Sequence, residues 1–250
     1  MSFAQLKPQF DRDGYVVVRQ LMPPEQFAGL NRALDQYIRD VVPGLPPTDA
    51  FYDVDRSQPD SLKQLHRLDQ DAALAAYRDH PRWQALAEAL LGEPATAESP
   101  EWFNKPPLAR HGTPPHQDNY YFNLKPCSVV TLWMALDRVD DENACMRYVP
   151  GSHLGPVRPH DRSKVLGFSQ GITDYGELDQ VREVAIHLEP GDVTAHHGNL
   201  IHLAGQNRST TRQRRAFAIV FKGASCRRDE EAFARYQAAV AKQQAELAAS

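Results

Sequence analysis

Residues 115–122, PHQDNYYF, contain a histidine and an aspartate two positions apart, between prolines and a run of aromatic residues. In an extended strand every second side chain projects from the same face, so we expect His116 and Asp118 to converge on one point. An imidazole and a carboxylate are both ligands for metal ions. Because such pairs also occur in the solvated strands of many proteins, this pair alone does not establish a metal site.

A further ligand is expected from the histidine-rich segment at residues 189–221. A Gly-Asn turn separates His196 and His197 from His202, and after this turn His202 shares a strand face with Ala204. We predict His202 as the third metal ligand. The other two histidines flank the turn, either as donors near the ligands or as exposed turn residues, and for His196 the exposed position is favoured.

Two histidines and one carboxylate, with two ligands close together and the third far along the chain, fit a 2-His-1-carboxylate site for Fe(II). Three protein ligands on one face leave positions open for a bidentate cosubstrate and for dioxygen, and open positions indicate catalysis. A structural zinc ion would need a fourth ligand, usually cysteine. Cys127, Cys145 and Cys226 show no CxxC spacing, so we expect reduced thiols and no disulfide framework.

A basic run, RQRR at residues 212–215, precedes the apolar strand AFAIVF. A guanidinium group binds a carboxylate through two parallel hydrogen bonds, which fits the distal carboxylate of 2-oxoglutarate. Because Arg214 and Arg215 project to opposite faces of a strand, only one of them can point inward. We expect Arg212 and the other member of the pair to be solvated.

The chain has 250 residues, of which 42% are hydrophobic, and a formal net charge of −4. These values predict one sizeable core and a single domain. No apolar stretch is long enough to span a membrane, and the N-terminus lacks the features of a secretory signal, so we expect a cytoplasmic location. The mild acidity argues against a nucleic-acid partner.

The elements that must position these residues change in type along the chain. Residues 1–94 are expected to be mainly helical, with a strand after Gly14, a Pro-rich loop at 43–53, and helices at 71–78 and 81–91. Another helix follows Pro24, and its apolar positions at helical spacing are Phe27, Leu30, Leu34, Ile38 and Val41.

From about residue 95 to residue 223 the pattern consists of short β segments separated by Pro, Gly and Asn, which predicts a sandwich or barrel. Residues 229–248 are rich in Ala, Gln and charge and predict a C-terminal surface helix. The expected fold class is therefore mainly β, with α-helices flanking an antiparallel core.

Several motifs, in this order, resemble the phytanoyl-CoA dioxygenase family of Fe(II)/2-oxoglutarate oxygenases: FNKPP, TPPHQD, TLWMALDRVDDENACMRYVPGSH, and GDVTAHHGNLIHLAGQNRS followed by RRA. The resemblance covers most of the chain. It implies a double-stranded β-helix, a cupin-like jelly roll, that uses Fe(II), 2-oxoglutarate and O2. It also implies His116, Asp118 and His202 as iron ligands, and Arg214 best matches the arginine that binds the distal carboxylate of 2-oxoglutarate.

The sequence departs from the family pattern at two places. Many members have a serine two residues after the distal histidine, where this chain has Ala204. The loop before Arg214 is one residue longer than usual, which leaves the choice between Arg214 and Arg215 open. Four further residues on neighbouring strands are placed to line the cofactor pocket, although core packing explains the tryptophan equally well; they are Asn104, Lys105, Thr131 and Trp133.

Asp118 favours hydroxylation, because related halogenases replace this carboxylate with a small residue. We expect hydroxylation of an aliphatic C–H bond in a small, polar metabolite, with release of succinate and CO2. A non-catalytic metabolite-binding module and a cupin-like enzyme with another divalent metal are the alternatives. Candidates for the substrate pocket are Tyr120, Tyr121, Phe51, Tyr52, Arg56 and Arg158.

The segment at residues 154–178 is long and polar and is expected to be a loop that covers the site. Its basic residues could attract an anionic substrate, but a solvated loop with local ion pairs is the favoured interpretation. These residues are Arg158, His160, Arg162 and Lys164.

Overall fold

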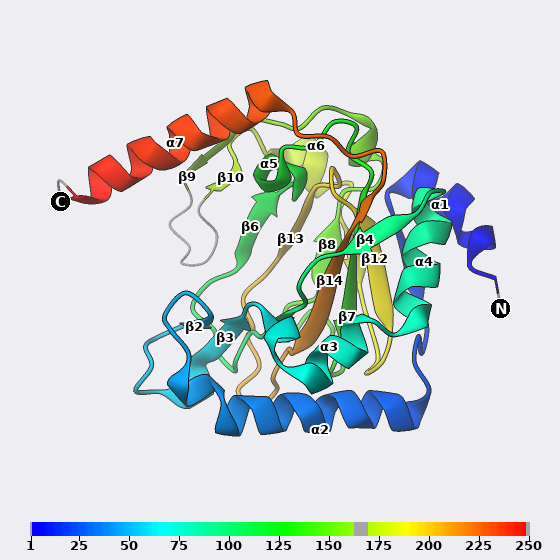
Figure 1. Ribbon diagram of the computed structural model, residues 1–250. Helices are drawn as coiled ribbons and strands as arrows, with labels where there is room; N and C mark the ends of the chain where they lie inside the picture. The colour runs from blue at the N-terminus through cyan, green and yellow to red at the C-terminus, as the bar shows by residue number, and fades with distance from the viewer. Residues whose placement is uncertain (1, 163–169, 249–250) are drawn as a thin grey trace.

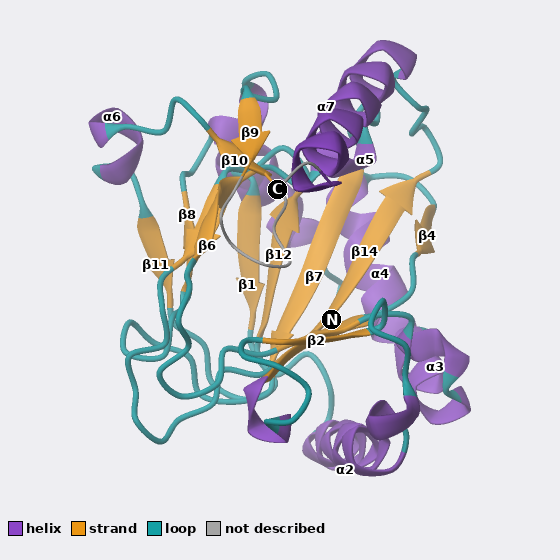
Figure 2. Cartoon of the chain, turned by 90° about the vertical axis from the view of Figure 1, so that its left-hand side faces the viewer, coloured by secondary structure: helices purple, strands orange, loops and turns teal. Residues whose placement is uncertain are grey.

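A computed structural model describes residues 2–162 and 170–248 of the chain. Two antiparallel sheets lie against each other, and helices cover the outer face of the larger sheet (Figures 1 and 2). This arrangement is the double-stranded β-helix expected from the sequence. Lys164, predicted as a basic residue of the covering loop, lies outside the described residues.

The larger sheet has the strand order β1-β12-β7-β14-β5-β3-β2, and β4 also pairs with β14. Along the chain its strands are β1 (Tyr15–Val18), β2 (Ala50–Tyr52), β3 (Leu62–Leu65), β4 (Ala95–Ala97), β5 (Glu101–Phe103), β7 (Val129–Ala135), β12 (Val193–His197) and β14 (Ala216–Gly223).

The smaller sheet has the order β11-β8-β13-β6. Its strands are β6 (Thr113–His116), β8 (Met146–Tyr148), β11 (Val184–Ile186) and β13 (His202–Ala204), and a separate hairpin pairs β9 (His160–Arg162) with β10 (Gln170–Ile172). The helices are α1 (Lys7–Asp13), α2 (Pro24–Asp40), α3 (Ala72–Arg78), α4 (Pro81–Leu91), α5 (Asn119–Phe122), α6 (Glu177–Gln180) and α7 (Glu230–Ala248).

Strand β14 shows how the sequence separates the two faces of the larger sheet. Phe217 and Phe221 belong to the outer core with Trp83 of α4, whereas Ala216 and Ala218 face the inner core between the sheets. Side chains alternate along a strand, so the large residues fill the helix-covered face and the small ones leave room inside. Burying an aromatic side chain of this kind stabilises the fold by roughly 1.5–3 kcal/mol.

The N-terminal part is less purely helical than predicted. Gly14, at φ 81°, ends α1 in the left-handed region that favours glycine and leads into β1. Strand β1 then pairs with β12, so that Tyr15 lies opposite His196. The Pro-rich segment, predicted as a loop, contributes strand β2, because Ala50 finds a partner in Leu65 that no local pattern reveals.

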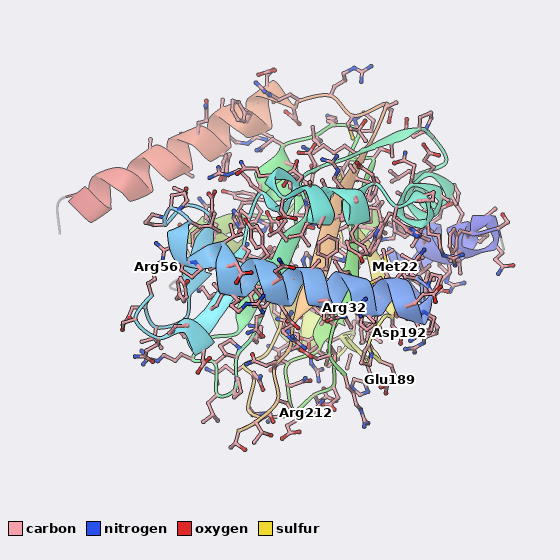
Figure 3. All side chains as sticks on the ribbon, turned by 60° about the horizontal axis from the view of Figure 1, so that its bottom comes forward. Met22, Arg32, Arg56, Glu189, Asp192 and Arg212 are labelled. Atoms are coloured by element: carbon pink, nitrogen blue, oxygen red, sulfur yellow. The ribbon has the colours of Figure 1, made fainter. Side chains whose placement is uncertain are left out.

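The predicted helix after Pro24 is confirmed as α2, which runs along the bottom of the molecule in Figure 1 and across the front in Figure 3. Leu30 and Leu34 are buried. Val41 is an exception to the predicted apolar face: it is 39% exposed, because the helix ends at Asp40. The predicted helices at 71–78 and 81–91 correspond to α3 and α4.

The segment predicted as a covering loop, residues 154–178, contains strand β9, strand β10 and the start of α6. The C-terminal helix α7 projects past α5 at one edge of the molecule (Figure 1). Among the described residues, the structure has no helix that combines the length and apolar character needed to cross a bilayer.

Candidate metal centre and cofactor pocket

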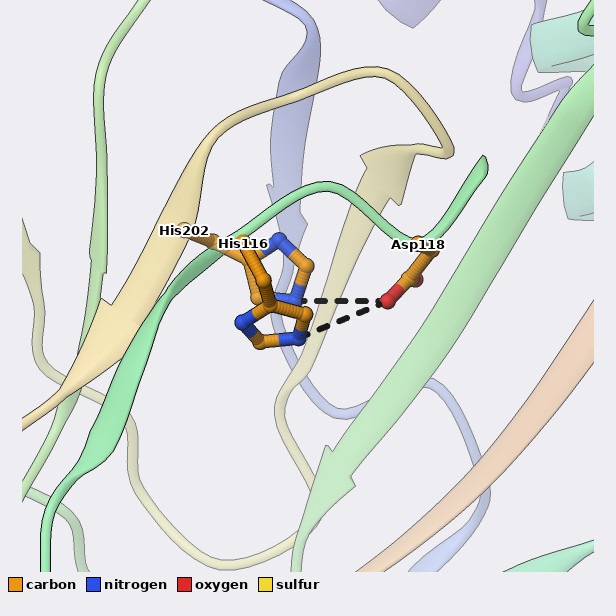
Figure 4. A group of neighbouring side chains, drawn as sticks. All are labelled: His116, Asp118 and His202. Atoms are coloured by element: carbon orange, nitrogen blue, oxygen red, sulfur yellow. Dashed lines mark ion pairs between the residues drawn. The ribbon is translucent and has the colours of Figure 1, made fainter. Parts of the chain in front are cut away.

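His116, Asp118 and His202 come together between the two sheets (Figure 4). His116 ends β6 and His202 begins β13, and these two residues lie opposite each other in the smaller sheet. Nε2 of each imidazole lies 3.6 Å from Oδ1 of Asp118, and the two rings are 4.0 Å apart between centroids. The sequence prediction that these three side chains converge agrees with this geometry.

The route by which Asp118 reaches the histidines differs from the prediction. Strand β6 ends at His116, and Asp118 has helical dihedral angles, φ −55° and ψ −37°, directly before α5. The two side chains therefore do not share a face of one extended strand. The turn from strand into helix swings the carboxylate toward the imidazoles instead.

Both ligand-type histidines are fixed by backbone carbonyl groups. Nδ1 of His116 donates to the carbonyl oxygen of Pro114 at 2.8 Å, and Nδ1 of His202 donates to that of Leu200 at 2.9 Å. This leaves Nε2 of each ring as the acceptor that a metal ion needs. Burial lowers the pKa of both imidazoles, most strongly for His202, which keeps them neutral.

The second oxygen of the Asp118 carboxylate, Oδ2, has two polar neighbours. Thr131 donates its hydroxyl to Oδ2 at 2.9 Å, and Nε2 of His196 lies 3.3 Å from the same atom. The Tyr148 hydroxyl lies 3.0 Å from Nδ1 of His196. Burial alone would raise the pKa of Asp118, but the neighbouring imidazoles of His202 and His196 outweigh it and lower the pKa.

The expectation that His196 is an exposed turn residue was wrong. His196 lies inside strand β12 and is only 1% exposed. The period-2 pattern of DVTAHH could have revealed this, because it places Thr194 and His196 on one face of the strand. The ligand atoms of His116, Asp118 and His202 lie within 4.8 Å of one another, and within residues 2–162 and 170–248 no fourth such ligand joins that group.

A cavity of about 490 Å³ opens beside the three side chains. Trp133, Thr131 and Tyr121 line it together with Arg214. Its volume falls in the range of pockets that hold small molecules. Three of the predicted pocket residues and the predicted arginine therefore share one space with the candidate ligands.

Arg214 and Arg215 differ sharply in their surroundings. Arg214 is 4% exposed, its guanidinium lies 5.2 Å from the centre of the Trp133 ring, and its Nε is buried without a hydrogen-bond partner. Burial lowers the pKa of Arg214 to about 10. Arg215 instead makes a bidentate pair with Asp137 outside the cavity.

Asn104 and Lys105 lie beside Arg214 rather than in the main cavity. Asn104 accepts a hydrogen bond from the backbone N–H of Arg214 at 3.3 Å, which fixes the approach to β14. Lys105 lines a smaller cavity of about 60 Å³ that also contains Arg214, and its Nζ donates to the His111 carbonyl at 3.1 Å. Burial and the nearby Arg214 lower the pKa of Lys105.

Several predicted substrate residues lie away from the cavity lining. Tyr120 stacks on His160 with a centroid distance of 4.1 Å, and Phe51 packs on His66 at 5.0 Å. Arg56 donates to backbone carbonyl groups just after α2, at the outer edge of the molecule (Figure 3).

Two basic residues form ion pairs: Arg158, in the segment predicted to cover the site, and Arg212, in the basic run before β14. Arg158 pairs with Asp174 and Asp179, each at 2.9 Å. Arg212 pairs with Asp140 and Glu142 at the surface, in agreement with its predicted solvated position. The local ion pairs thus favour the solvated interpretation of Arg158 over an anion site.

Several polar residues line the cavity that the sequence did not single out, among them Gln64, His66, Glu101 and Lys222. These four come from β5, β14 and the region of β3. The alternation of side chains in β5 and β14 could have placed Glu101 and Lys222 on the inner face. Nothing in the sequence marks β3 as a strand, because no clear turn pattern precedes it.

The family model for phytanoyl-CoA dioxygenase matches residues 10–216 of the chain. The chain belongs to the phytanoyl-CoA dioxygenase family. Peroxisomal phytanoyl-CoA dioxygenase of Homo sapiens is 29% identical over 235 residues, which cover 87% of this chain and 67% of the human protein. The Bos taurus protein is 32% identical over 175 residues, covering 66% of this chain and 50% of its own length.

Solved structures agree with this family assignment. EvdO2 from Micromonospora carbonacea var. aurantiaca, complexed with 2-oxoglutarate, aligns with a TM-score of 0.71 and 26% identity over 90% of this chain and 91% of its own. EctD from S. alaskensis aligns with a TM-score of 0.73 over 89% of this chain and 77% of its own, and at 19% identity it shows the fold alone.

Membership of the phytanoyl-CoA dioxygenase family confirms the predicted enzyme class, a non-haem Fe(II)/2-oxoglutarate dioxygenase. Iron, 2-oxoglutarate and dioxygen are accordingly the cofactor and cosubstrates of this enzyme. The two alternatives considered from the sequence, a non-catalytic module and a cupin-like enzyme with another metal, lose their support.

Proposed function

We propose that this member of the phytanoyl-CoA dioxygenase family hydroxylates an aliphatic C–H bond of a small, polar metabolite and releases succinate and CO2. The observation that carries the proposal is the convergence of His116, Asp118 and His202, within 4.8 Å of one another, beside a cavity that contains Arg214. An enzyme of this class binds both iron and 2-oxoglutarate. The three converging side chains are suited to the metal and the arginine to the cosubstrate.

His116, Asp118 and His202 are the proposed iron ligands. Two neutral imidazoles with Nε2 unprotonated and one ionised carboxylate form the donor set that non-haem Fe(II) prefers. When bound together, iron, 2-oxoglutarate and dioxygen supply the oxidising power for the C–H bond. Thr131 holds Asp118 through its other oxygen, beside which Nε2 of His196 lies, so that Oδ1 remains directed at the histidines.

Arg214 is the proposed partner of the distal carboxylate of 2-oxoglutarate. Its Nε is buried without a hydrogen-bond partner, which is costly unless a ligand supplies an acceptor. A planar guanidinium can offer two parallel hydrogen bonds to a carboxylate. The Trp133 ring, 5.2 Å from the guanidinium carbon, provides a cation–π contact and covers one side of the group.

A small substrate is favoured by the size and the walls of the cavity. Its volume of about 490 Å³ must hold both 2-oxoglutarate and the reacting part of the substrate. Apolar walls, with Phe103, Phe122 and Trp133 among them, exclude water, while a few polar groups orient the molecule.

The proposal is tested by two measurements on the full chain. Fe(II) binding is followed anaerobically by titration, and succinate formation from 2-oxoglutarate is followed aerobically with a panel of metabolites. We expect tight, stoichiometric Fe(II) binding in the native chain and its loss in His116→Ala and Asp118→Ala. His80→Gln, at a histidine outside the cavity and outside both groups of potential metal ligands, is the matched control and should bind Fe(II) normally.

Two results would contradict the proposal. A chain that binds no Fe(II) in the presence of 2-oxoglutarate would exclude the proposed ligand set. Turnover of a metabolite without 2-oxoglutarate or dioxygen would restore the cupin-like alternative. Succinate formation that depends on a metabolite, with an added hydroxyl group in the product, would support it.

A further inference from the structure

We propose that Glu101 recognises a cationic group, such as an ammonium, on the substrate of this enzyme. The inference rests on the proposed function, because it takes the cavity beside His116, Asp118 and His202 as the place where the substrate binds. It adds a substrate class, an amine-bearing metabolite, and a residue that selects it.

The position of Glu101 in the sheet directs its side chain into the cavity. Glu101 lies opposite Ala218 of β14, and Ala218 lies opposite Trp133 of β7. Residues that face each other across neighbouring strands share a sheet face, so these three form one row on the inner side. The methyl group of Ala218 leaves the space between the carboxylate and the tryptophan open, and all three residues line the cavity.

The carboxylate of Glu101 accepts few hydrogen bonds. Gln64 donates to Oε2 at 3.4 Å, and Nε2 of His66 lies 3.8 Å from Oε1, too far for a hydrogen bond. An ionised carboxylate can accept about four hydrogen bonds. Nε2 of His66 is itself buried and has no hydrogen-bond partner. The Glu101 side chain is 36% exposed and lines the cavity, so its carboxylate is accessible to a bound ligand.

Two other carboxylates near this sheet are paired with cations. Glu98, on the same wall, pairs with Lys222 at 3.0 Å, and Asp137 pairs with Arg215 at 2.7 Å. Among residues 2–162 and 170–248, no lysine or arginine forms an ion pair with Glu101. Because Lys222 already forms an ion pair with Glu98, it does not neutralise the charge of Glu101.

The energetics of the cavity favour a cation at this place. Burial raises the pKa of Glu101, and the Asp118 carboxylate raises it further, although His66 and Gln64 oppose the shift. A carboxylate in such surroundings gains from an opposite charge and penalises a like charge. An ammonium group would supply both the charge and the hydrogen-bond donors that Glu101 lacks.

Glu101 and the proposed 2-oxoglutarate partner, Arg214, lie at different points of the cavity lining, because Glu101 faces Ala218, four residues after Arg214 in the chain. Arg214, which is cationic, and Glu101, which is anionic, both line the same space. A molecule with a carboxylate is drawn to the first and one with an amine to the second. The two charges would therefore sort the cosubstrate and the substrate into different parts of one cavity.

The test compares three probes of one shape: 4-phenylbutylamine, 4-phenylbutanol and 4-phenylbutyrate. Their affinities are measured by calorimetry and ligand-observed NMR on the full chain, anaerobically, with Fe(II) and 2-oxoglutarate present. We expect the amine to bind about tenfold tighter than the alcohol, as for one charge-assisted hydrogen bond, and tighter still than the carboxylate.

Glu101→Gln should reduce the amine-to-alcohol ratio to near one, because it keeps the shape and removes the charge. Glu25→Gln, at an exposed glutamate of α2 outside the cavity, is the control for the loss of one negative charge and should keep the ratio. Glu101→Ala provides a second variant, and thermal melting checks the fold of each. An amine that binds no better than the alcohol, or a preference that survives in both Glu101 variants, would overturn the inference.

This outcome is separable from the proposed function. A chain that binds Fe(II) and 2-oxoglutarate but shows no amine preference contradicts the Glu101 inference alone. A chain that shows a Glu101-dependent amine preference without binding Fe(II) contradicts the proposed function and retains the recognition site.

Discussion

Arg214 and Arg215 are neighbours in the chain, yet their guanidinium groups lie on opposite sides of the larger sheet. Arg214 points into the cavity over Trp133, whereas Arg215 pairs with Asp137 on the outer side. The alternation of side chains in the two residues directly before β14 produces this separation. This separation supports Arg214, rather than Arg215, as the proposed partner of 2-oxoglutarate.

Replacing each arginine should therefore affect a different property. Arg214→Ala is expected to raise the KM for 2-oxoglutarate by tenfold or more, since about two charge-assisted hydrogen bonds are lost. Arg215→Ala should leave that KM unchanged and lower the free energy of unfolding by about 1 kcal/mol, because Asp137 loses its partner. Steady-state kinetics and urea denaturation measure the two effects. An increase of the KM in Arg215→Ala would contradict the assignment.

Thr131→Val should weaken iron binding without changing the shape of the pocket. The variant removes the hydroxyl that donates to Oδ2 of Asp118, and the loss of such a support to a metal ligand costs roughly 10–100-fold in affinity. Anaerobic Fe(II) titration measures the affinity. Thr96→Val, at an exposed position of β4, is the control and should bind iron as the native chain does. Equal affinities in both variants would show that Thr131 does not support the ligand.

Gly112→Ala should disturb the contact between the two ligand-bearing strands. A Cβ at Gly112 would lie 2.8 Å from the carbonyl oxygen of Ala204, a backbone atom that cannot move independently of β13. We expect a loss of about 1–3 kcal/mol in the free energy of unfolding, together with weaker Fe(II) binding. Gly44→Ala, where a Cβ would meet no atom within 4 Å, is the matched control. Chemical denaturation measures the free energy of unfolding of both variants. Equal values would contradict the close contact between residue 112 and the Ala204 carbonyl group.

The stability of the protein should fall as the pH decreases from about 6.5 toward 4, and His197 should contribute to this loss. Burial, assisted by His153, lowers the pKa of His197 to about 4. Between this value and the ordinary pKa of about 6.5, the unfolded chain binds a proton that the folded chain does not, so the free energy of unfolding decreases with falling pH. The slope from one such group is at most about 1.4 kcal/mol per pH unit.

His197→Gln removes this group and should reduce the slope. Urea denaturation of the native chain and the variant at pH 7.5, 6 and 5 measures the dependence. In the native structure Nδ1 of His197 accepts a hydrogen bond from the Asn199 N–H at 3.0 Å, and a glutamine side chain offers an acceptor in its place. A slope that is the same in both proteins would exclude His197 as a contributor.

The amino-acid sequence by itself determined the types of ligand, the order of the elements and the alternation within each strand. Two imidazoles and a carboxylate at His116, Asp118 and His202 predicted their chemistry, and Gly14 predicted the end of a helix, because these signals are local. The alternation at the start of β14 likewise required one of the two arginines to face inward.

Only the tertiary structure decided which residues meet across distant strands. The burial of His196 depends on the pairing of β12 with β1 and β7, and the row of Glu101, Ala218 and Trp133 depends on the register of three strands far apart in the chain. The approach of Asp118 depends on a turn into α5 that an extended pattern does not foresee. Register is set by the packing of whole sheets, and a one-residue slip would turn these side chains to the other face.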